Sequence, residues 1–360
     1  MDPTPGLTDI SASLNGTLAS AGCVVESPEY ITNGVVTFHF TSSSHSTTAT
    51  YNVGTTQTYA QVSNVQLNAA TTYSVYASCT ATNGTAVTSS STSLTTAAAA
   101  TAKPSESWLE LPAADTKLYP NAEELKISAS GERNYTAYYD KSTYTSMWTA
   151  YPLQSKHMGS LSRPSKWYFN TEIGEEYQVD LTSSSYEGST YSRGHLIPNA
   201  SRNGISEMQK QTFYVTNSVP QVQDKFNSGI WSSLEGALQS MAKSGETLYI
   251  VTGVAFSKVG ETKSVSYIQA KDDNKNIPIP NYFYKIVLKV TTNSSGTVTS
   301  ASTIGFWFEN KAYSNSTYEN CAVSVDQVEQ WTGFDFFANL PDGIEASAET
   351  NTNWSSFQSF

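Results

Sequence analysis

The stretch from Tyr191 to Glu235 constrains the fold of this chain more than any other part of its sequence. It contains His195, one of only four histidines, between a glycine and an apolar run. Its pattern predicts a short strand over Thr212 to Thr216, then a turn at Pro220 and a helix that begins near Asn227. One local unit therefore carries a histidine, a helix-borne amide and, two turns further along the helix, a carboxylate.

These side chains suit the hydrolysis of a phosphodiester bond. The reaction needs a base that activates water, positive charge beside the phosphate, and stabilisation of the departing 3′ oxygen. We predict His195 as the base, because an imidazole with a pKa of about 6.5 is largely neutral at working pH. Arg193 is a candidate to hold the phosphate through two hydrogen bonds. The alternative for Arg193 is an ion pair at the surface.

A magnesium ion is predicted to supply the remaining charge, because Mg²⁺ keeps most of its waters and needs few protein ligands. We predict the amide oxygen of Asn227 as its direct contact, and Glu235 as the group that holds metal-bound waters. The two residues are eight positions apart, so on a helix they lie within about 80° of each other and border one site. Two alternatives stay open: Asn227 as a helix N-cap, and Glu235 on a solvated helix face.

Residues 1–97 predict an all-β domain. Short segments rich in Val, Thr and Tyr alternate apolar and polar residues, and Asn-Gly pairs separate them. The stretch VQLNAATTYSVYASCTATNGTAVTSSSTSLTT resembles the second half of a fibronectin type III domain. The resemblance implies an immunoglobulin/fibronectin-like sandwich, in which Tyr73 is the corner tyrosine whose hydroxyl returns to the backbone.

Residues 98–106 are a low-complexity run of small residues, which predicts a linker. From residue 107 to 360 the composition shifts toward Trp, Tyr, Lys and Arg. GETLYIVTGVAF, IPIPNYFYKIVLKVTT and TSASTIGFWFEN predict buried strands, and SVDQVEQW predicts a short amphipathic helix capped by Ser324 or Asp326. We therefore expect a second, α+β domain with a mixed sheet and flanking helices.

Several segments of this second domain, in order, resemble the DNA/RNA non-specific endonuclease family with its ββα-metal core. RGHLIPN resembles the family's DRGH signature, QTFYVTNSVPQ its strand and turn, and FNSGIWSSLE its metal-binding helix. LYIVTGVAF, IPNYFYKIVL and WTGFDFFANLP match later core segments. The resemblance implies a nuclease that acts on DNA and RNA with little base preference and leaves 5′-phosphate ends.

Carried over position by position, the resemblance assigns His195 as the general base, Asn227 as the metal ligand, Glu235 as the holder of metal waters and Arg193 as a phosphate contact. It also implies that Asn217 and Gln221 line the site and contact substrate. Both amides have an alternative role, which is to satisfy backbone groups of the loop. The implied cofactor is Mg²⁺, with Mn²⁺ or Ca²⁺ as other candidates.

The sequence departs from the family pattern at two places. Ser192 stands where the DRGH motif has its aspartate, which removes a carboxylate near the metal waters. After Glu235, Gln239 and Lys243 stand where many members have an arginine. Arg202 is a candidate to supply that missing substrate contact. Arg163 is the other candidate, although its loop-like surroundings favour an ordinary surface position.

The net charge of −11 argues against tight, storage-type binding of nucleic acid. Residues 1–100 have four acidic residues and no Lys or Arg, and the remainder has 20 basic against 27 acidic residues, a charge of −7. An enzyme that must release its product tolerates this acidity. The alternative to a nuclease is a catalytically weakened protein of the same fold that only binds nucleic acid. In a third hypothesis the first domain is the functional part, which binds a surface glycan or protein, and the second domain is a scavenging enzyme.

Three cysteines and the chain start indicate little more. Cys23 and Cys79 form either a disulfide or two separately buried thiols, and Cys321 is distant from both. No run of 18 apolar residues exists, so no membrane span is predicted. The polar, Tyr-rich composition favours a secreted, periplasmic or cell-surface protein whose export signal has been removed. Cytosolic residence is the alternative.

Overall fold

The computed structural model describes the chain except residues 1–3, 16–17, 69, 97–107 and 114–117. The chain forms two compact units. The N-terminal unit contains Met1–Thr101 with Pro341–Ala346, and the C-terminal unit contains Ala102–Leu340 with Ser347–Phe360. The predicted linker 98–106 and the predicted domain start at residue 107 lie outside the described residues.

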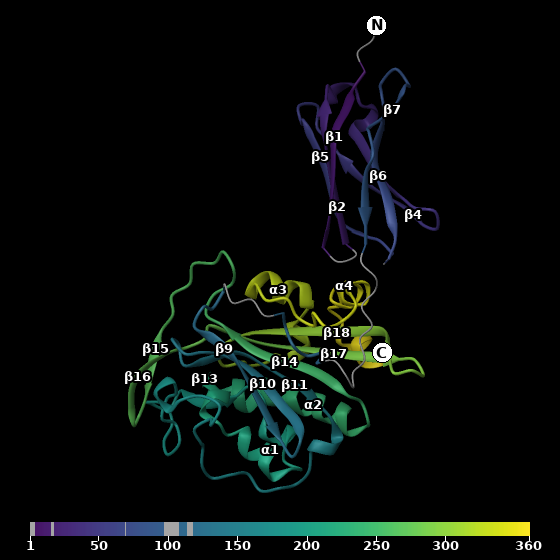
Figure 1. The fold of residues 1–360 in the computed structure, drawn as a ribbon. Helices are drawn as coiled ribbons and strands as arrows, with labels where there is room; N and C mark the ends of the chain where they lie inside the picture. The colour runs from purple at the N-terminus through teal and green to yellow at the C-terminus, as the bar shows by residue number, and fades with distance from the viewer. Residues whose placement is uncertain (1–3, 16–17, 69, 97–107, 114–117) are drawn as a thin grey trace. The chain divides into compact units, whose positions relative to one another are not determined.

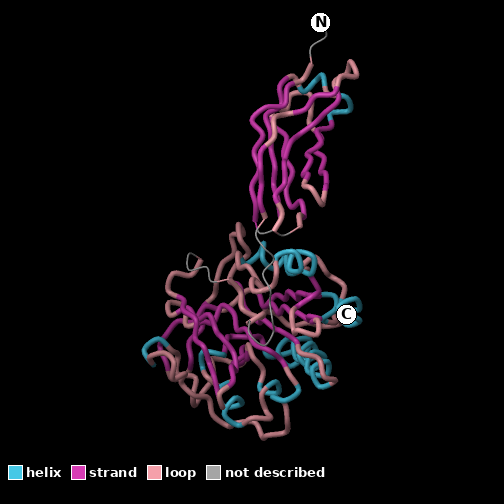
Figure 2. The backbone as a smooth tube through the Cα atoms, turned by 45° about the vertical axis from the view of Figure 1, so that its right-hand side comes forward, coloured by secondary structure: helices cyan, strands magenta, loops and turns pink. Residues whose placement is uncertain are grey.

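The N-terminal unit is built from two antiparallel sheets, joined by a few short helical turns (Figure 2). One sheet has the order β1 (Gly6–Asn15), β2 (Leu18–Glu26) and β5 (Tyr59–Gln66). The other has the order β4 (Ser46–Asn52), β3 (Val35–Thr41), β6 (Thr72–Thr80) and β7 (Ala86–Thr88), with β8 (Thr92–Thr95) also paired to β6. Inward-facing residues of both sheets share one hydrophobic core.

Tyr73 behaves as the sequence predicts. Its ring is fully buried in that core, and its hydroxyl accepts a hydrogen bond of 3.0 Å from the backbone N–H of Asn68. Cys23 on β2 and Cys79 on β6 are both buried in the same core as free thiols. The prediction of an all-β unit is therefore confirmed, while its resemblance to fibronectin type III stays a proposal.

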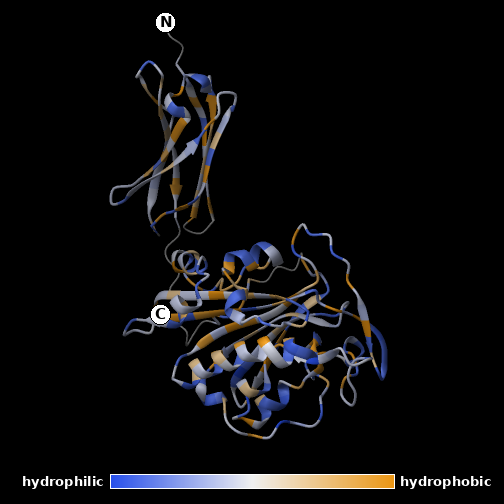
Figure 3. Cartoon of the chain, turned by 180° about the vertical axis from the view of Figure 1, so that it is seen from behind, coloured by the Kyte–Doolittle hydropathy of each residue, from blue (hydrophilic) through white to orange (hydrophobic). Residues whose placement is uncertain are grey.

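The C-terminal unit is built on one seven-stranded sheet. Its spatial order is β19 (Ala322–Val323), β18 (Val298–Glu309), β17 (Tyr282–Thr292), β14 (Leu248–Ala255), β11 (Thr145–Leu153), β10 (Glu132–Asp140) and β9 (Ala122–Ala129). Every ladder of this sheet is antiparallel, and a parallel pairing occurs at the isolated bridge between Tyr168 and Tyr214. Hydrophobic residues are concentrated along the strands (Figure 3).

Helices cover both faces of this sheet, which explains why β11 and β14 are buried along their whole length. Figure 1 shows α1 (Ser206–Gln211) and α2 (Ser232–Lys243) on one face and α3 (Val325–Thr332) on the other. The chain ends with α4 (Asp342–Ala348) and α5 (Trp354–Ser359). Within the described residues, no helix has both the length and the hydropathy needed to cross a bilayer.

The helix α3 follows the predicted pattern closely. The hydroxyl of Ser324, its N-cap, accepts a hydrogen bond of 3.1 Å from the N–H of Gln327. Val325 and Val328 form its fully buried face. The α+β architecture predicted for this part of the chain is thus confirmed.

Two short strands and a helix form a separate motif beside the sheet. β12 (Tyr191–His195) pairs antiparallel with β13 (Ser218–Val222), and an irregular π-helical segment, Gln223–Trp231, leads into α2. Two expectations were wrong here. Thr212 to Thr216 is not a strand, because its backbone forms tight turns that bring the chain to β13. Regular α-helix begins at Ser232 rather than near Asn227, because Gly229, which lies between them, has non-helical backbone angles (φ −128°, ψ −111°) that interrupt the helix.

Candidate active site

The ββα motif opens on a cleft of about 530 Å³. The cleft brings together four of the predicted site residues, His195, Arg193, Asn227 and Glu235. Its other lining residues come from β12, from the loops before and after it, from the irregular segment and from α2: Arg163, Trp167, Ser185, Ser192, Pro198, Asn199, Ala200, Gln223, Ser232, Gly236 and Gln239. Three predicted residues, Asn217, Gln221 and Arg202, do not line it.

His195, at the end of β12, lies in an aromatic corner. Its ring centroid is 4.5 Å from that of Trp167 and 4.8 Å from that of Phe213. Its Nε2 is buried and has no hydrogen-bond partner among the described residues. Burial, and then the charges of Arg163 and Arg193, lower the pKa of His195 to about 3. The imidazole is therefore neutral near pH 7.

Arg193 precedes His195 by two residues, and the loop before β12 anchors one end of its guanidinium group. Its Nη1 donates hydrogen bonds to the carbonyl oxygens of Leu181 and Ser184, at 2.7 and 3.0 Å. Its guanidinium carbon lies 5.1 Å from the centroid of the Trp167 ring. One nitrogen is thus used for anchoring, and the side chain still reaches the cleft.

Arg163, the second candidate for the missing substrate contact, has the exposed position that its loop-like surroundings favoured, and it also lines the cleft. Its guanidinium carbon lies 5.0 Å from the Phe213 ring that packs against His195. The sequence signal was weak: an arginine shortly before Trp167, in a loop without a regular pattern. Only the tertiary contacts of that loop bring it to His195.

Asn227 lies in the irregular segment before α2, not at a helix N-cap. Its Nδ2 donates to the hydroxyl of Ser192 at 3.1 Å and to Oε1 of Gln223 at 2.9 Å. Its Oδ1 has no hydrogen bond to the described residues, so the amide oxygen is available to a ligand. Ser192, which replaces the motif aspartate, thus helps to orient the amide.

Glu235, on the first turn of α2, is largely buried but lines the cleft. Burial raises the pKa of its carboxyl, and the ammonium of Lys285 on β17 opposes that rise. The ammonium nitrogen is 4.0 Å from Oε1 of Glu235. Sequence reasoning missed Lys285, because one lysine in a strand of hydrophobic residues gives no signal of its partner.

Asn217 has the structural role that was left open for it. It is fully buried, and its side chain bonds both backbone groups of Ile197 and the carbonyl of Thr212, at 2.8 to 3.0 Å. These bonds fix the loop that follows His195. Gln221 is also fully buried and packs against Gly194, where a Cβ atom would come within 2.4 Å of its Oε1. Neither amide reaches the cleft.

Arg202 is not a substrate contact in this structure. It is fully buried, and it donates to Oδ1 and O of Asn134, to the carbonyl of Ser201 and to the carbonyl of Pro152. All three guanidinium nitrogens are therefore engaged inside the unit. Its charge is compensated by these acceptors, as a buried arginine requires.

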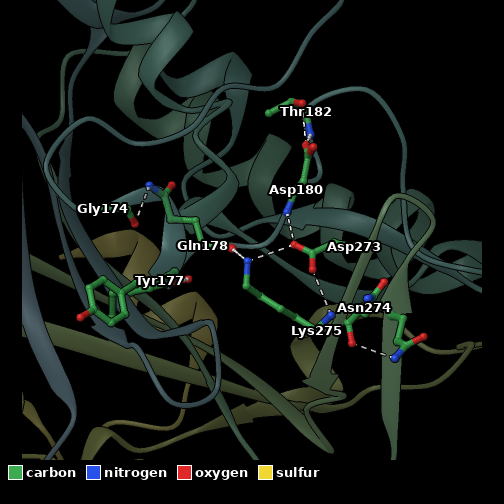
Figure 4. Close-up of polar contacts among 10 residues, drawn as sticks. Gly174, Tyr177, Gln178, Asp180, Thr182, Asp273, Asn274 and Lys275 are labelled. Atoms are coloured by element: carbon green, nitrogen blue, oxygen red, sulfur yellow. Dashed lines mark hydrogen bonds and ion pairs between the residues drawn. The ribbon is translucent and has the colours of Figure 1, made fainter.

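The loop that anchors Arg193 is itself held by a hairpin, β15 (Tyr267–Ala270) and β16 (Asp273–Pro278). Figure 4 shows the polar contacts: Oδ2 of Asp273 accepts from the N–H of Asp180 at 2.9 Å, and Nζ of Lys275 donates to the carbonyl of Gln178 at 2.6 Å. On the far side of the loop, the N–H of Lys271 donates to the carbonyl of Ser185. The hairpin therefore fixes the loop on both sides of the Arg193 acceptors.

Comparisons with known proteins identify the family of the C-terminal unit. The model of the DNA/RNA non-specific endonuclease family matches residues 118–343. A nuclease of Nostoc sp. is 29% identical over 225 residues, which cover 62% of this chain and 77% of that protein. The mitochondrial Nuclease 1 of Schizosaccharomyces pombe is 27% identical, over 58% of this chain and 66% of that protein. Mouse mitochondrial nuclease EXOG is 33% identical, over 43% of this chain and 42% of that protein.

A solved structure supports the fold. A chain in the crystal structure of the EndoG/EndoGI complex superposes with a TM-score of 0.52 at 20% sequence identity, covering 65% of this chain and 90% of that chain. The match to the family model spans more than half of the present sequence. The prediction of a nuclease is thereby confirmed, and the chain belongs to the DNA/RNA non-specific endonuclease family.

Proposed function

We propose that this protein is a metal-dependent endonuclease that hydrolyses both DNA and RNA and leaves 5′-phosphate ends. One observation carries the proposal: the neutral imidazole of His195 shares a cleft with the free amide oxygen of Asn227, the carboxylate of Glu235 and two arginines. The set supplies a base, a cation site and phosphate contacts within one small volume.

His195 acts as the general base. Its low pKa keeps it unprotonated, and Nε2, which has no protein partner in the described structure, accepts the proton of the attacking water. Trp167 and Phe213 pack against the ring and fix its plane. Arg163 and Arg193 bind the non-bridging phosphate oxygens, where negative charge increases in the transition state.

The cleft fits a divalent cation such as Mg²⁺, with Mn²⁺ or Ca²⁺ as other candidates. Hard cations take oxygen ligands, and the amide nitrogen of Asn227 is occupied, which leaves its oxygen for the metal. Glu235 on the same cleft would hold metal-bound waters. When bound, the cation supplies positive charge beside the phosphate and the departing 3′ oxygen.

The N-terminal unit extends the proposal beyond the catalytic fold. Its strand order and the hydrogen bond of Tyr73 support a fibronectin type III-like sandwich. We propose that this unit attaches the nuclease to a surface glycan or protein, and that the protein works outside the cytosol. A glycan array probed with the full chain, and with the chain lacking residues 1–97, tests this: equal signals would refute glycan attachment.

The central experiment incubates the protein with supercoiled plasmid and with RNA, with and without Mg²⁺. We expect metal-dependent cleavage of both, and a loss of about 10²- to 10⁴-fold in the His195→Ala variant. His39→Ala is the matched control, because that ring bonds Ser78 in the N-terminal unit. Products that accept kinase label only after phosphatase treatment would have 5′-phosphate ends.

Absence of cleavage in any divalent metal, combined with tight binding of nucleic acid, would replace the enzyme by the binding-only alternative. Full activity in His195→Ala would contradict the mechanism. The hydroxyl of Ser192, which still orients Asn227, is the structural observation that favours the enzyme.

A further inference from the structure

Lys285 is a buried cation directly beneath the cleft. It lies in the middle of β17 and is fully buried, in register with Thr252 of β14 and Phe306 of β18. Its ammonium donates a hydrogen bond to the hydroxyl of Thr252 and lies 4.7 Å from the centroid of the Trp231 ring. It is not among the residues that line the cleft. A buried ammonium is costly, so it requires a compensating charge.

Glu235 supplies that charge. The ammonium nitrogen is 4.0 Å from Oε1, and Oε1 is buried without a hydrogen-bond partner among the described residues. The carboxylate therefore directs one oxygen to the buried lysine, while the residue still lines the cleft. In this arrangement each ion lowers the cost of burying the other.

We propose that Lys285 is a positioning residue: its buried ammonium attracts Oε1 of Glu235 and holds that oxygen away from the cleft, which leaves the other carboxyl oxygen for the metal waters. This inference rests on the proposed function, in which Glu235 holds metal-bound waters. Lys285 itself touches neither substrate nor metal. It acts on the side chain of Glu235, which would hold the metal-bound waters.

Lys285→Met tests the proposal, with Lys289→Met as the matched control. Lys289 lies on the same strand and face, is also buried, and forms an ion pair of 3.3 Å with Glu246 away from the cleft. We expect Lys285→Met to raise the half-saturating Mg²⁺ concentration and to lower kcat/KM by about 10- to 100-fold, as loss of a group that orients metal-site residues does. Lys289→Met should leave both within about twofold.

The melting temperature of the metal-free protein gives a readout that does not depend on activity. Lys285→Met should lower it in the wild-type background, because a buried carboxylate loses its counter-charge. In the Glu235→Gln background the same substitution should lower the melting temperature little, because no buried carboxylate loses its counter-charge. The kcat/KM of Glu235→Gln should likewise show no further loss when Lys285→Met is added.

An equal melting-temperature penalty in both backgrounds would overturn the proposal, and so would a folded Lys285→Met variant with wild-type Mg²⁺ dependence. If Lys285→Met alone does not fold, the double variant decides: a folded double variant supports the proposal, and an unfolded one overturns it. Full activity in Glu235→Gln would instead contradict the proposed role of Glu235. The melting temperatures of the metal-free single and double variants would still show whether the ion pair exists.

Discussion

At the scale of single residues, Ser192 shows how a hydroxyl serves at the position where the family motif has a carboxylate. It accepts from the amide nitrogen of Asn227 at 3.1 Å. We expect Ser192→Ala to raise the half-saturating Mg²⁺ concentration about tenfold, because the amide loses one of its two acceptors. Ser192→Asp should lower it, because a carboxylate accepts the same bond and adds charge. Ser240→Ala, on the exposed side of α2, is the control. Equal Mg²⁺ titrations in all three variants would contradict this role.

His195 also predicts a pH dependence of stability. Its pKa is about 3 when folded and about 6.5 when unfolded, so below pH 6.5 the unfolded chain binds a proton that the folded protein does not. The stability from this group is complete above pH 6.5 and falls as the pH drops toward 3. From pH 7 to 5 it should lose about 2 kcal/mol. Urea unfolding of metal-free wild type and His195→Ala at both pH values checks this. The same pH sensitivity in both proteins would contradict it.

At the scale of structural elements, the sequence predicted site residues that lie within one segment of the chain. It missed contacts that form only when distant segments pack together. His195, Asn227 and Glu235 lie within one ββα segment, so motif and spacing were sufficient to group them. Lys285 reaches Glu235 only because β17 lies under α2. Arg202 was misassigned because its burial depends on acceptors from Asn134 and Pro152, far away along the chain. Periodicity also failed at Thr212 to Thr216, where buried turns have the composition of a strand.

The β15–β16 hairpin is the element whose contribution we can test most directly. Asp273→Ala removes the acceptor of the Asp180 N–H and loosens the loop whose carbonyls hold Arg193. We expect roughly a tenfold loss in kcat/KM, because a small displacement of Arg193, the proposed phosphate contact, slows the reaction. The exposed neighbour Asp272, changed to Ala, is the control. If Asp273→Ala lowers kcat/KM as much in the Arg193→Ala variant as in the wild type, the hairpin does not act through Arg193.

At the scale of the whole molecule, a charge of −11 must be reconciled with a polyanionic substrate. Among the residues that line the cleft, the cations are Arg163 and Arg193. Binding through about two phosphate contacts gives log K against log[salt] a slope of about −2, far shallower than an extended basic surface gives. Weak, local attraction of this kind lets an acidic enzyme capture a phosphodiester and still release its products.

This prediction is checked with His195→Ala, which should bind without cleaving. Its affinity for a short labelled duplex, measured at fixed Mg²⁺ over a range of KCl, should follow a slope of about −2. Adding Arg163→Ala should reduce the slope by about one, because one phosphate contact is lost. Replacing Lys126, a lysine of β9 paired with Glu124, should leave it unchanged. A slope steeper than about −6 would show that the acidic molecule binds nucleic acid over a surface well beyond this cleft.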